Sequence, residues 1–177
     1  PHCSICGETP VRKKTQHYFF KLKNFSDKLT VYLNDNENLQ KDVKKYVQNW
    51  IKEGLVDWDI TRDISWGVPV PIDSASDKVF YGWFDNHLAY ISSAIKFLND
   101  NGKDGKAFWN ESDIYHFIGK DIVYHHYLFL PAMRLGIEEE YKLPDYIPTR
   151  GHLTLQSKKI SKSRNWYIGL KDFLQIF

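Results

Sequence analysis

The chain has 177 residues, of which 42% are hydrophobic and 16% aromatic, enough for one ordinary domain with a sizeable core. Its formal net charge of +2 is too small to indicate general nucleic-acid binding. No run approaches the ~18 apolar residues of a membrane-spanning helix, and the polar start carries no signal-peptide pattern. We therefore expect a cytoplasmic protein without a membrane partner.

Cys3 and Cys6 form a Cys-x-x-Cys pair that is followed by Gly7. In a cytosolic chain this spacing is typical of half a zinc knuckle, because the glycine lets backbone amides turn toward the thiolates. A redox dithiol would be expected near a βαβ pattern, and none follows directly. His2 and His17 are further candidate ligands. We predict that Cys3 and Cys6 are half of a structural Zn²⁺ site whose other half lies upstream of this piece.

Periodic segments follow the cysteine pair. Residues 15–22 alternate as a strand, and Ser26 is the predicted N-cap of a short helix over 27–33. A longer helix over 39–51 has one apolar face and a C-cap at Gly54. That face consists of Leu39, Val43, Tyr46, Val47, Trp50 and Ile51.

Residues 58–63, Trp-Asp-Ile-Thr-Arg-Asp, are dense in side chains with functional chemistry. They are also consistent with a capped surface segment, whose Arg–Asp pair contributes little to stability if exposed. Residues 79–85 predict a buried strand and residues 87–99 a helix. Glycines around residues 101–105 predict a loop.

The second half of the chain contains a βαβ pattern. Residues 114–118 predict a strand, residues 119–121 a turn, and residues 122–135 a helix kinked by Pro131. Residues 146–155 then predict a strand that Gly151 interrupts. Because such a crossover joins parallel strands, the predicted fold class is α/β with a parallel sheet.

The turn after the first of these strands contains Gly119 and Asp121. A glycine allows close approach of the backbone to a ligand, and an aspartate that opens a helix can accept hydrogen bonds from a ribose. A helix N-cap explains Asp121 equally well.

Residues 159–163, Lys-Ile-Ser-Lys-Ser, place two ammonium groups on one short loop. Between Arg150 and Asp172 there are six cations and one acid. Ammonium groups meet phosphate oxygens as point charges, and open α/β sheets bind ligands at the carboxyl ends of their strands. We predict a phosphate site at Lys159 and Lys162. A solvated basic loop is the alternative, because so short a motif arises easily by chance.

Taken together, four segments resemble the methionyl-tRNA synthetase family of class I aminoacyl-tRNA synthetases. They are Trp58–Asp63, Val79–Asp85, His116–Ile122 and Gly151–Ser163. The last resembles the class signature KMSKS, with Ile160 keeping the apolar character of the usual methionine. The resemblance covers nearly the whole chain and implies the second half of a Rossmann-like nucleotide-binding fold. It divides the chain into the end of a zinc-bearing connective insertion (1–24), the catalytic half-fold (25–155), and the KMSKS-type loop with the start of a stem-contact region (156–177).

The resemblance implies a two-step reaction. Methionine attacks the α-phosphorus of ATP, bound with Mg²⁺, to give methionyl-adenylate and pyrophosphate, and the methionyl group then passes to tRNA(Met). The implied catalytic residues are Lys159, Lys162 and Arg62, with Asp121 orienting Arg62. The implied ATP-binding residues are Gly119, Asp121, Lys159, Ser161, Lys162 and Ser163. The implied amino-acid pocket consists of Trp83, Tyr90, Ile122 and His126. Without the resemblance, His126 would be interpreted as a satisfied helix histidine.

The other class signature, HIGH, does not occur in the sequence. We therefore expect this chain to be an excised piece or one product of a split gene. It should be inactive alone and should need an N-terminal, HIGH-containing half as partner.

The sequence also departs from the family around the implied pocket. Asn86 and His87 stand where the family usually has alanine and often proline, His125 replaces phenylalanine, and Leu130 replaces tryptophan. Half of a class I synthetase for another amino acid, such as isoleucine, leucine or cysteine, is therefore an alternative, because polar pocket groups discriminate strongly. A non-catalytic relative that binds tRNA or a protein partner through the basic C-terminal face is another.

Overall fold

The computed structural model describes residues 2–4 and 6–176. It divides into two compact units that are each discontinuous in sequence. The first unit comprises Pro1–Ser26 and Gly54–Asn110, and the second comprises Asp27–Glu53 and Glu111–Phe177. Among the described residues, no helix has both the length and the apolar character required to cross a bilayer.

Antiparallel strand pairs form the sheet portion of the first unit. β1 (Phe19–Phe20) pairs with β2 (Trp58–Asp59), and β3 (Thr61–Arg62) pairs with β4 (Val79–Phe80). The predicted strand over residues 15–22 therefore enters a ladder only at Phe19–Phe20. The Trp58–Asp63 segment forms two consecutive strands, so Arg62 is fixed by a ladder and does not lie in a loop.

The α-helices of the first unit follow β4, whereas two 3₁₀ turns, Leu22–Phe25 and Asp73–Ala75, precede it. The predicted strand over residues 79–85 is wrong beyond Phe80, because the chain turns into a helix at Gly82. The Asn86 amide donates to the Gly82 carbonyl at 3.1 Å, which closes this helical turn. The three helices are α3 (Gly82–Asp85), α4 (Ala89–Asp100) and α5 (Gly105–Glu111).

The loop predicted around Gly105 is in fact the start of α5. A Cβ at this position would lie 2.6 Å from the backbone of Ile95 in α4. Glycine is therefore required here by a close approach between two helices, which local sequence patterns do not reveal.

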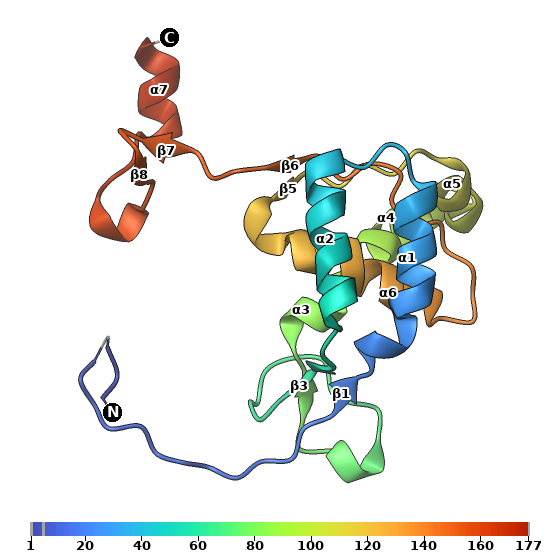
Figure 1. Cartoon of the computed structure of the whole chain (residues 1–177), viewed down its shortest axis with the longest axis horizontal. Helices are drawn as coiled ribbons and strands as arrows, with labels where there is room; N and C mark the ends of the chain where they lie inside the picture. The colour runs from blue at the N-terminus through green and yellow to red at the C-terminus, as the bar shows by residue number, and fades with distance from the viewer. Residues whose placement is uncertain (1, 5, 177) are drawn as a thin grey trace. The chain divides into compact units, whose positions relative to one another are not determined.

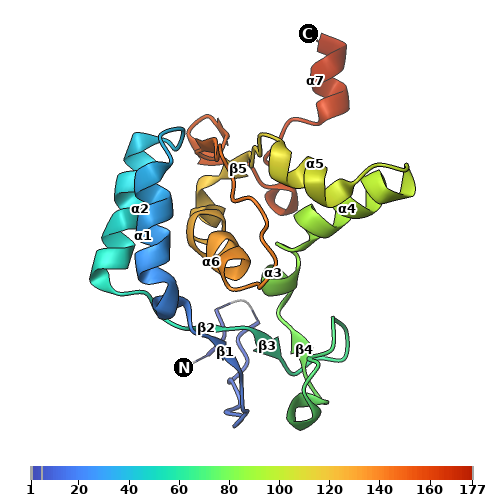
Figure 2. The ribbon, with the colours of Figure 1, turned by 90° about the vertical axis from the view of Figure 1, so that its right-hand side faces the viewer.

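The second unit begins with a helical hairpin, α1 (Ser26–Asp35) and α2 (Lys41–Glu53), whose helices lie side by side in Figures 1 and 2. Leu29 and Leu33 of α1 are fully buried. The predicted apolar face of the second helix is confirmed in part, because Leu39 and Val47 are buried whereas Tyr46 is 56% exposed. Gly54 follows α2 with a φ of +100°, which confirms its predicted role as a C-cap.

A short parallel sheet forms the centre of the second unit. β5 (Ile118–Gly119) pairs with β6 (Thr149–Arg150), with Ile118 opposite Thr149, and a bridge between Tyr115 and Tyr146 extends the pairing. The predicted α/β class with a parallel sheet is confirmed. Since the strands run in the same direction, the residues after Gly119 and after Arg150 leave the sheet at the same end.

The crossover between β5 and β6 is helical but irregular. A 3₁₀ turn at Lys120–Ile122 precedes a π-helical turn at His125–Phe129 and α6 (Leu130–Leu135). The Leu130 amide donates to the His125 carbonyl, five residues earlier. The wide turn comes directly before Pro131, which has no N–H and would clash with a carbonyl four residues earlier in a regular helix.

The C-terminal part consists of a β-hairpin and a short helix. β7 (Thr154–Leu155) pairs antiparallel with β8 (Lys158–Lys159), and α7 (Leu170–Ile176) follows. The predicted interruption of the 146–155 strand at Gly151 is confirmed, because β6 ends at Arg150 and β7 begins at Thr154. Gln156 and Ser157 have φ values of 49° and 61°, as a two-residue type I′ hairpin turn requires.

Candidate functional site

The turns at the carboxyl end of the parallel sheet carry the predicted ribose-binding residues. The Nε2 atom of His152, which follows β6, lies 3.5 Å from Oδ1 of Asp121, which follows β5. A Cβ at Gly119 would lie 2.6 Å from this same carboxylate oxygen. Glycine therefore allows the Asp121 side chain to fold back over the end of β5.

The lysine loop is part of the hairpin formed by β7 and β8. Lys159, on β8, lies opposite Thr154 of β7. Lys162 begins a 3₁₀ turn, Lys162–Arg164. Both lysine side chains are exposed. No described residue forms an ion pair with either ammonium group, so both charges face solvent and are available to an anion.

Trp166 closes this loop. Its backbone forms a pair of hydrogen bonds with Ser161, at 2.9 and 3.0 Å. The indole N–H donates to the Leu155 carbonyl at 3.0 Å, and the Lys158 Nζ lies 5.1 Å from the centre of the ring. The backbone from residue 155 to residue 166 is thus fixed at several points around the exposed lysines. The sequence analysis did not identify Trp166.

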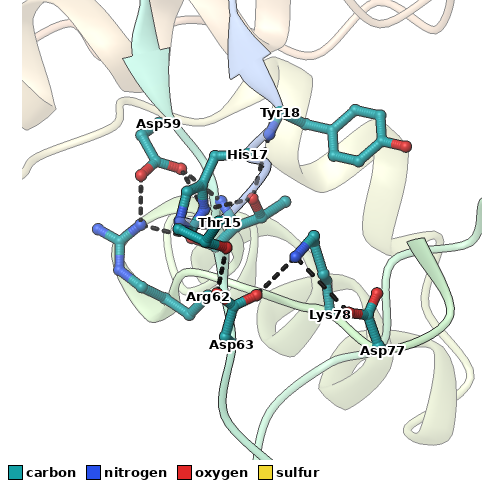
Figure 3. Close-up of polar contacts among 9 residues, drawn as sticks. Thr15, His17, Tyr18, Asp59, Arg62, Asp63, Asp77 and Lys78 are labelled. Atoms are coloured by element: carbon teal, nitrogen blue, oxygen red, sulfur yellow. Dashed lines mark hydrogen bonds and ion pairs between the residues drawn. The ribbon is translucent and has the colours of Figure 1, made fainter. Parts of the chain in front are cut away.

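Arg62 is held in the first unit by groups on β2 and β3 (Figure 3) and by the residue after β4. Its Nη1 lies 3.1 Å from Oδ2 of Asp59 and donates to the Thr61 carbonyl at 2.6 Å. Its Cζ lies 3.8 Å from the centre of the Tyr81 ring, a cation–π contact. The sequence predicted Arg62 but missed Asp59 and Tyr81 as its partners.

A second polar group lies beside Arg62 in Figure 3. The Asp63 carboxylate accepts a hydrogen bond from Lys78 at 2.5 Å and another from the Thr15 hydroxyl. The hydrogen bond with Asp63 raises the pKa of the buried Lys78 amine, and the same bond lowers the pKa of the Asp63 carboxyl. Asp63 thus joins the N-terminal segment to the strand pair β3–β4.

A pocket of about 900 Å³ lies against Arg62 within the first unit. Trp83, predicted for the amino-acid pocket, also lines it, so two predicted site residues share one cavity. Asn86, one of the departures from the family pattern, lies in the same wall. The full lining is Arg62, Ile64, Ser65, Trp66, Gly67, Val68, Phe80, Tyr81, Gly82, Trp83, Asp85 and Asn86.

The other predicted pocket residues, Ile122 and His126, lie one helical turn apart in the second unit. His126 is buried, and its Nδ1 lies 3.0 Å from the Ile122 carbonyl. Burial lowers the pKa of His126, so the ring is neutral and Nδ1–H donates to that carbonyl. Trp83 and Tyr90 belong to the first unit, and the grouping of all four residues in one pocket stays a prediction.

The predicted zinc ligands lie in a tight turn at the N-terminus. The Gly7 amide donates to the Cys3 carbonyl at 2.9 Å, and Cys3 and Cys6 do not form a disulfide. His17 instead contacts Thr61 through hydrogen bonds. Within residues 2–4 and 6–176, no three His, Cys, Asp or Glu side chains converge as a metal site. Two thiolates do not complete a tetrahedral zinc site, so the described residues do not fit a whole one.

Comparisons with known proteins agree with the motifs. The family model for tRNA synthetases class I (M) matches residues 1–177. The methionine–tRNA ligases of Methanopyrus kandleri and Methanobrevibacter smithii are 46% and 47% identical over 179 residues, covering 100% of this chain and 26% of each relative. The chain thus spans about a quarter of the length of these relatives.

Solved structures give the same result. A Mycobacterium tuberculosis methionyl-tRNA synthetase in complex with methionyl-adenylate is 28% identical with a TM-score of 0.78, covering 99% of this chain and 34% of that one. A second structure, bound by methionyl-adenylate, has a TM-score of 0.72 and covers 93% of this chain and 32% of that one. By sequence and by structure, the chain belongs to the class I tRNA synthetase (M) family, whose curated members are methionine–tRNA ligases.

Proposed function

We propose that this chain is the second half of the Rossmann-like catalytic region of a methionyl-tRNA synthetase. The complete enzyme activates methionine with ATP to methionyl-adenylate and transfers the methionyl group to tRNA(Met). The observation that carries the proposal is the parallel pairing of β5 with β6, because it brings the Gly119–Asp121 turn and His152 to one end of a sheet. Open α/β sheets bind nucleotides at that end. The proposal keeps the segments 1–24, 25–155 and 156–177 in the roles that the resemblance implies.

ATP is the proposed ligand of the turn after β5. Gly119 leaves room beside the backbone for the Asp121 side chain, and the Asp121 carboxylate accepts hydrogen bonds from the ribose hydroxyls. Mg²⁺ enters as part of the substrate, bound to the phosphates. The exposed position of Asp121, with 62% of its side chain accessible, supports a role toward a ligand.

Lys159 and Lys162 are proposed to stabilise the charge that develops on the leaving pyrophosphate. Groups aimed at developing charge typically contribute ~10²–10³ in rate each. Ser161 and Ser163, whose hydroxyl oxygens lie 3.1 Å apart, supply further hydrogen-bond donors to the phosphates. The loop closure by Trp166 supports this role, because a fixed backbone reduces the entropy lost on binding.

Arg62 is proposed to bind an anionic group of the reactants, either the methionine carboxylate or a phosphate. A guanidinium presents its N–H groups in a planar fork that matches both anions. The proposed walls for the methionine side chain are Trp83, Tyr90, Ile122 and His126, since aromatic and aliphatic groups suit a polarizable thioether. The pocket shared by Arg62 and Trp83 supports the first part of this assignment.

Reconstitution tests the proposal. The chain is combined with an N-terminal, HIGH-containing segment of a close relative, and exchange of labelled pyrophosphate into ATP is measured with and without methionine. We expect exchange that depends on methionine and on both parts, and that Lys162→Ala lowers ~10²–10³-fold. A well-folded pair that shows no exchange with any amino acid would contradict the catalytic proposal and favour a non-catalytic tRNA-binding relative.

A different amino-acid substrate is the second candidate, because Asn86 lines the pocket that Arg62 and Trp83 share. A polar amide in such a wall can hydrogen-bond a substrate side chain that methionine does not have. Exchange measured across the amino acids, with Asn86→Ala as the variant that restores the usual family residue, separates the two. Methionine specificity that is the same in both proteins supports the first candidate.

A further inference from the structure

Arg62 contacts its neighbours in the protein through one nitrogen of its guanidinium. The Asp59 and Thr61 contacts are both made by Nη1. A guanidinium has five N–H donors, so in the part of the chain that the structure describes the Nη2 and Nε groups remain for a ligand. Tyr81 covers one face of the guanidinium. The contacts with Asp59, Thr61 and Tyr81 therefore fix the guanidinium, and Arg62 also lines the 900 Å³ pocket.

Asp59 is itself fixed in place. Its Oδ1 accepts the Thr61 amide at 3.1 Å, and its backbone pairs with Phe19 in the β1–β2 ladder. The same oxygen lies 3.4 Å from Nδ1 of His17. One carboxylate oxygen thus faces the backbone and His17, while the other faces Arg62, as Figure 3 shows.

His17 comes from the N-terminal arm, which we define as residues 15–20. Its Nδ1 also lies 3.0 Å from the Thr61 hydroxyl, and the Tyr18 amide donates to that hydroxyl at 3.1 Å. Thr15 reaches Asp63, on the other side of Arg62. The arm therefore binds the β2–β3 segment on both sides of the arginine.

We infer that Asp59 is a positioning residue for Arg62, and that His17 of the N-terminal arm holds Asp59 in the orientation which this requires. Only the kinetic test of this inference rests on the proposed function. About a third of each side chain in the Asp59–Arg62 pair is exposed, so the pair contributes little to stability. Its effect is on orientation: a long arginine side chain that is already ordered loses less entropy when it binds an anion.

The first test measures Arg62 directly in the chain as it is. The side chain of Arg62, labelled with ¹⁵N at Nε, should show restricted motion in ¹⁵N relaxation measurements. Asp59→Asn keeps the size of the side chain but removes its charge, and we expect the amplitude of the Arg62 side-chain motion to increase clearly. Asp57→Asn is the matched control, because Asp57 lies two residues away and pairs with Lys23 at 3.7 Å.

The second test uses methionine-dependent pyrophosphate exchange in the reconstituted protein. We expect Asp59→Asn to lower kcat about tenfold with a smaller change in KM for ATP, while Asp57→Asn stays within about twofold. His17→Ala should lower kcat less, and His17→Gln should restore much of the loss, because its amide can take the position of Nδ1 beside Asp59 and Thr61.

These results decide separately on the inference and on the proposed function. If the reconstituted wild type shows no pyrophosphate exchange, the proposed function fails, while the motion of the Arg62 side chain still tests the positioning role. If Asp59→Asn does not fold, the comparison of His17→Ala with His17→Gln replaces it. Arg62 dynamics that are equal in Asp59→Asn and Asp57→Asn, or equal in both His17 variants and the wild type where Asp59→Asn is unfolded, would overturn the inference.

Discussion

The imidazole of His152 and the carboxylate of Asp121 lie 3.5 Å apart across the carboxyl ends of two parallel strands. The contact connects two turns that are about thirty residues apart in the chain. It also gives the ribose-binding proposal a specific geometry. A nucleotide that binds the Asp121 carboxylate would either displace the His152 imidazole from it or contact both side chains.

Replacing Asp121 should weaken nucleotide binding without unfolding the protein. Asp121→Asn removes the negative charge that accepts hydrogen bonds from ribose hydroxyls, and we expect about a tenfold loss of affinity for an adenylate analogue. Its side chain is 62% exposed, so the urea midpoint should change little. Asp113→Asn is the control, as that side chain is 70% exposed and lies 4.0 Å from Lys142. Equal affinities by titration calorimetry in both variants would refute the role of Asp121.

The charge of Lys162 should matter for the reaction and not for the fold. Lys162→Ala removes an exposed ammonium group, so we expect pyrophosphate exchange to fall ~10²–10³-fold while thermal stability is retained. Lys171→Ala, in the exposed helix α7, removes the same charge elsewhere in the basic C-terminal region. A similar loss of exchange in both variants would indicate a general electrostatic effect.

Trp166 should control the order of the lysine loop. Trp166→Phe loses the hydrogen bond to the Leu155 carbonyl but keeps a ring beside Lys158, whereas Trp166→Ala loses both. Amide hydrogen exchange in residues 154–166 should therefore increase in the order wild type, Phe, Ala. Trp66→Ala serves as a control, because Trp66 is 86% exposed in the first unit. No change in exchange for Trp166→Ala would show that the loop is ordered by other contacts.

Acid should destabilise the second unit through its buried histidines. Burial lowers the pKa of His116 to about 3, with Arg134 and His126 as further causes, and burial also lowers the pKa values of His125 and His126. Since the folded form binds these protons less readily than the unfolded form, the stabilising contribution is complete above pH ~6.5 and is lost as the pH falls toward 3. Each such histidine contributes a slope of at most about 1.4 kcal/mol per pH unit.

His116→Gln isolates this contribution. The free energy of unfolding, measured with urea between pH 7.5 and pH 4.5, should fall less steeply in the variant than in the wild type, because one titrating group has been removed. Equal slopes in the two proteins would mean that His116 is protonated in the folded state or exposed to solvent.

Sequence patterns predicted those elements whose stability is local. The apolar periodicity of α2 and the glycine–aspartate turn after β5 were sufficient, because each depends on neighbouring residues. The hairpin of β7 and β8 was missed because its turn places Gln156 and Ser157 at positive φ without the usual Asn-Gly signal. The start of α5 at Gly105 depends on contact with Ile95, which no local pattern contains.

The sequence likewise predicted those site residues that local motifs contain. Family motifs pointed to Arg62, and the three-residue spacing from Asp59 was a visible signal for their ion pair. Tyr81 reaches the same guanidinium only through the pairing of β3 with β4, so its role requires knowledge of strand register. Trp166 similarly acts on the lysines through Leu155, eleven residues earlier.

The pairing of β1 with β2 has a consequence for synthesis on the ribosome. Phe19–Phe20 leaves the exit tunnel well before Trp58–Asp59, and the hairpin of α1 and α2 is translated between them. The nascent phenylalanines therefore remain without their ladder for the time needed to add those helices. A slow codon within α2 would lengthen that interval, and chaperone capture should be greater for stalled chains whose Trp58–Asp59 strand is still inside the tunnel than for chains in which that strand has emerged.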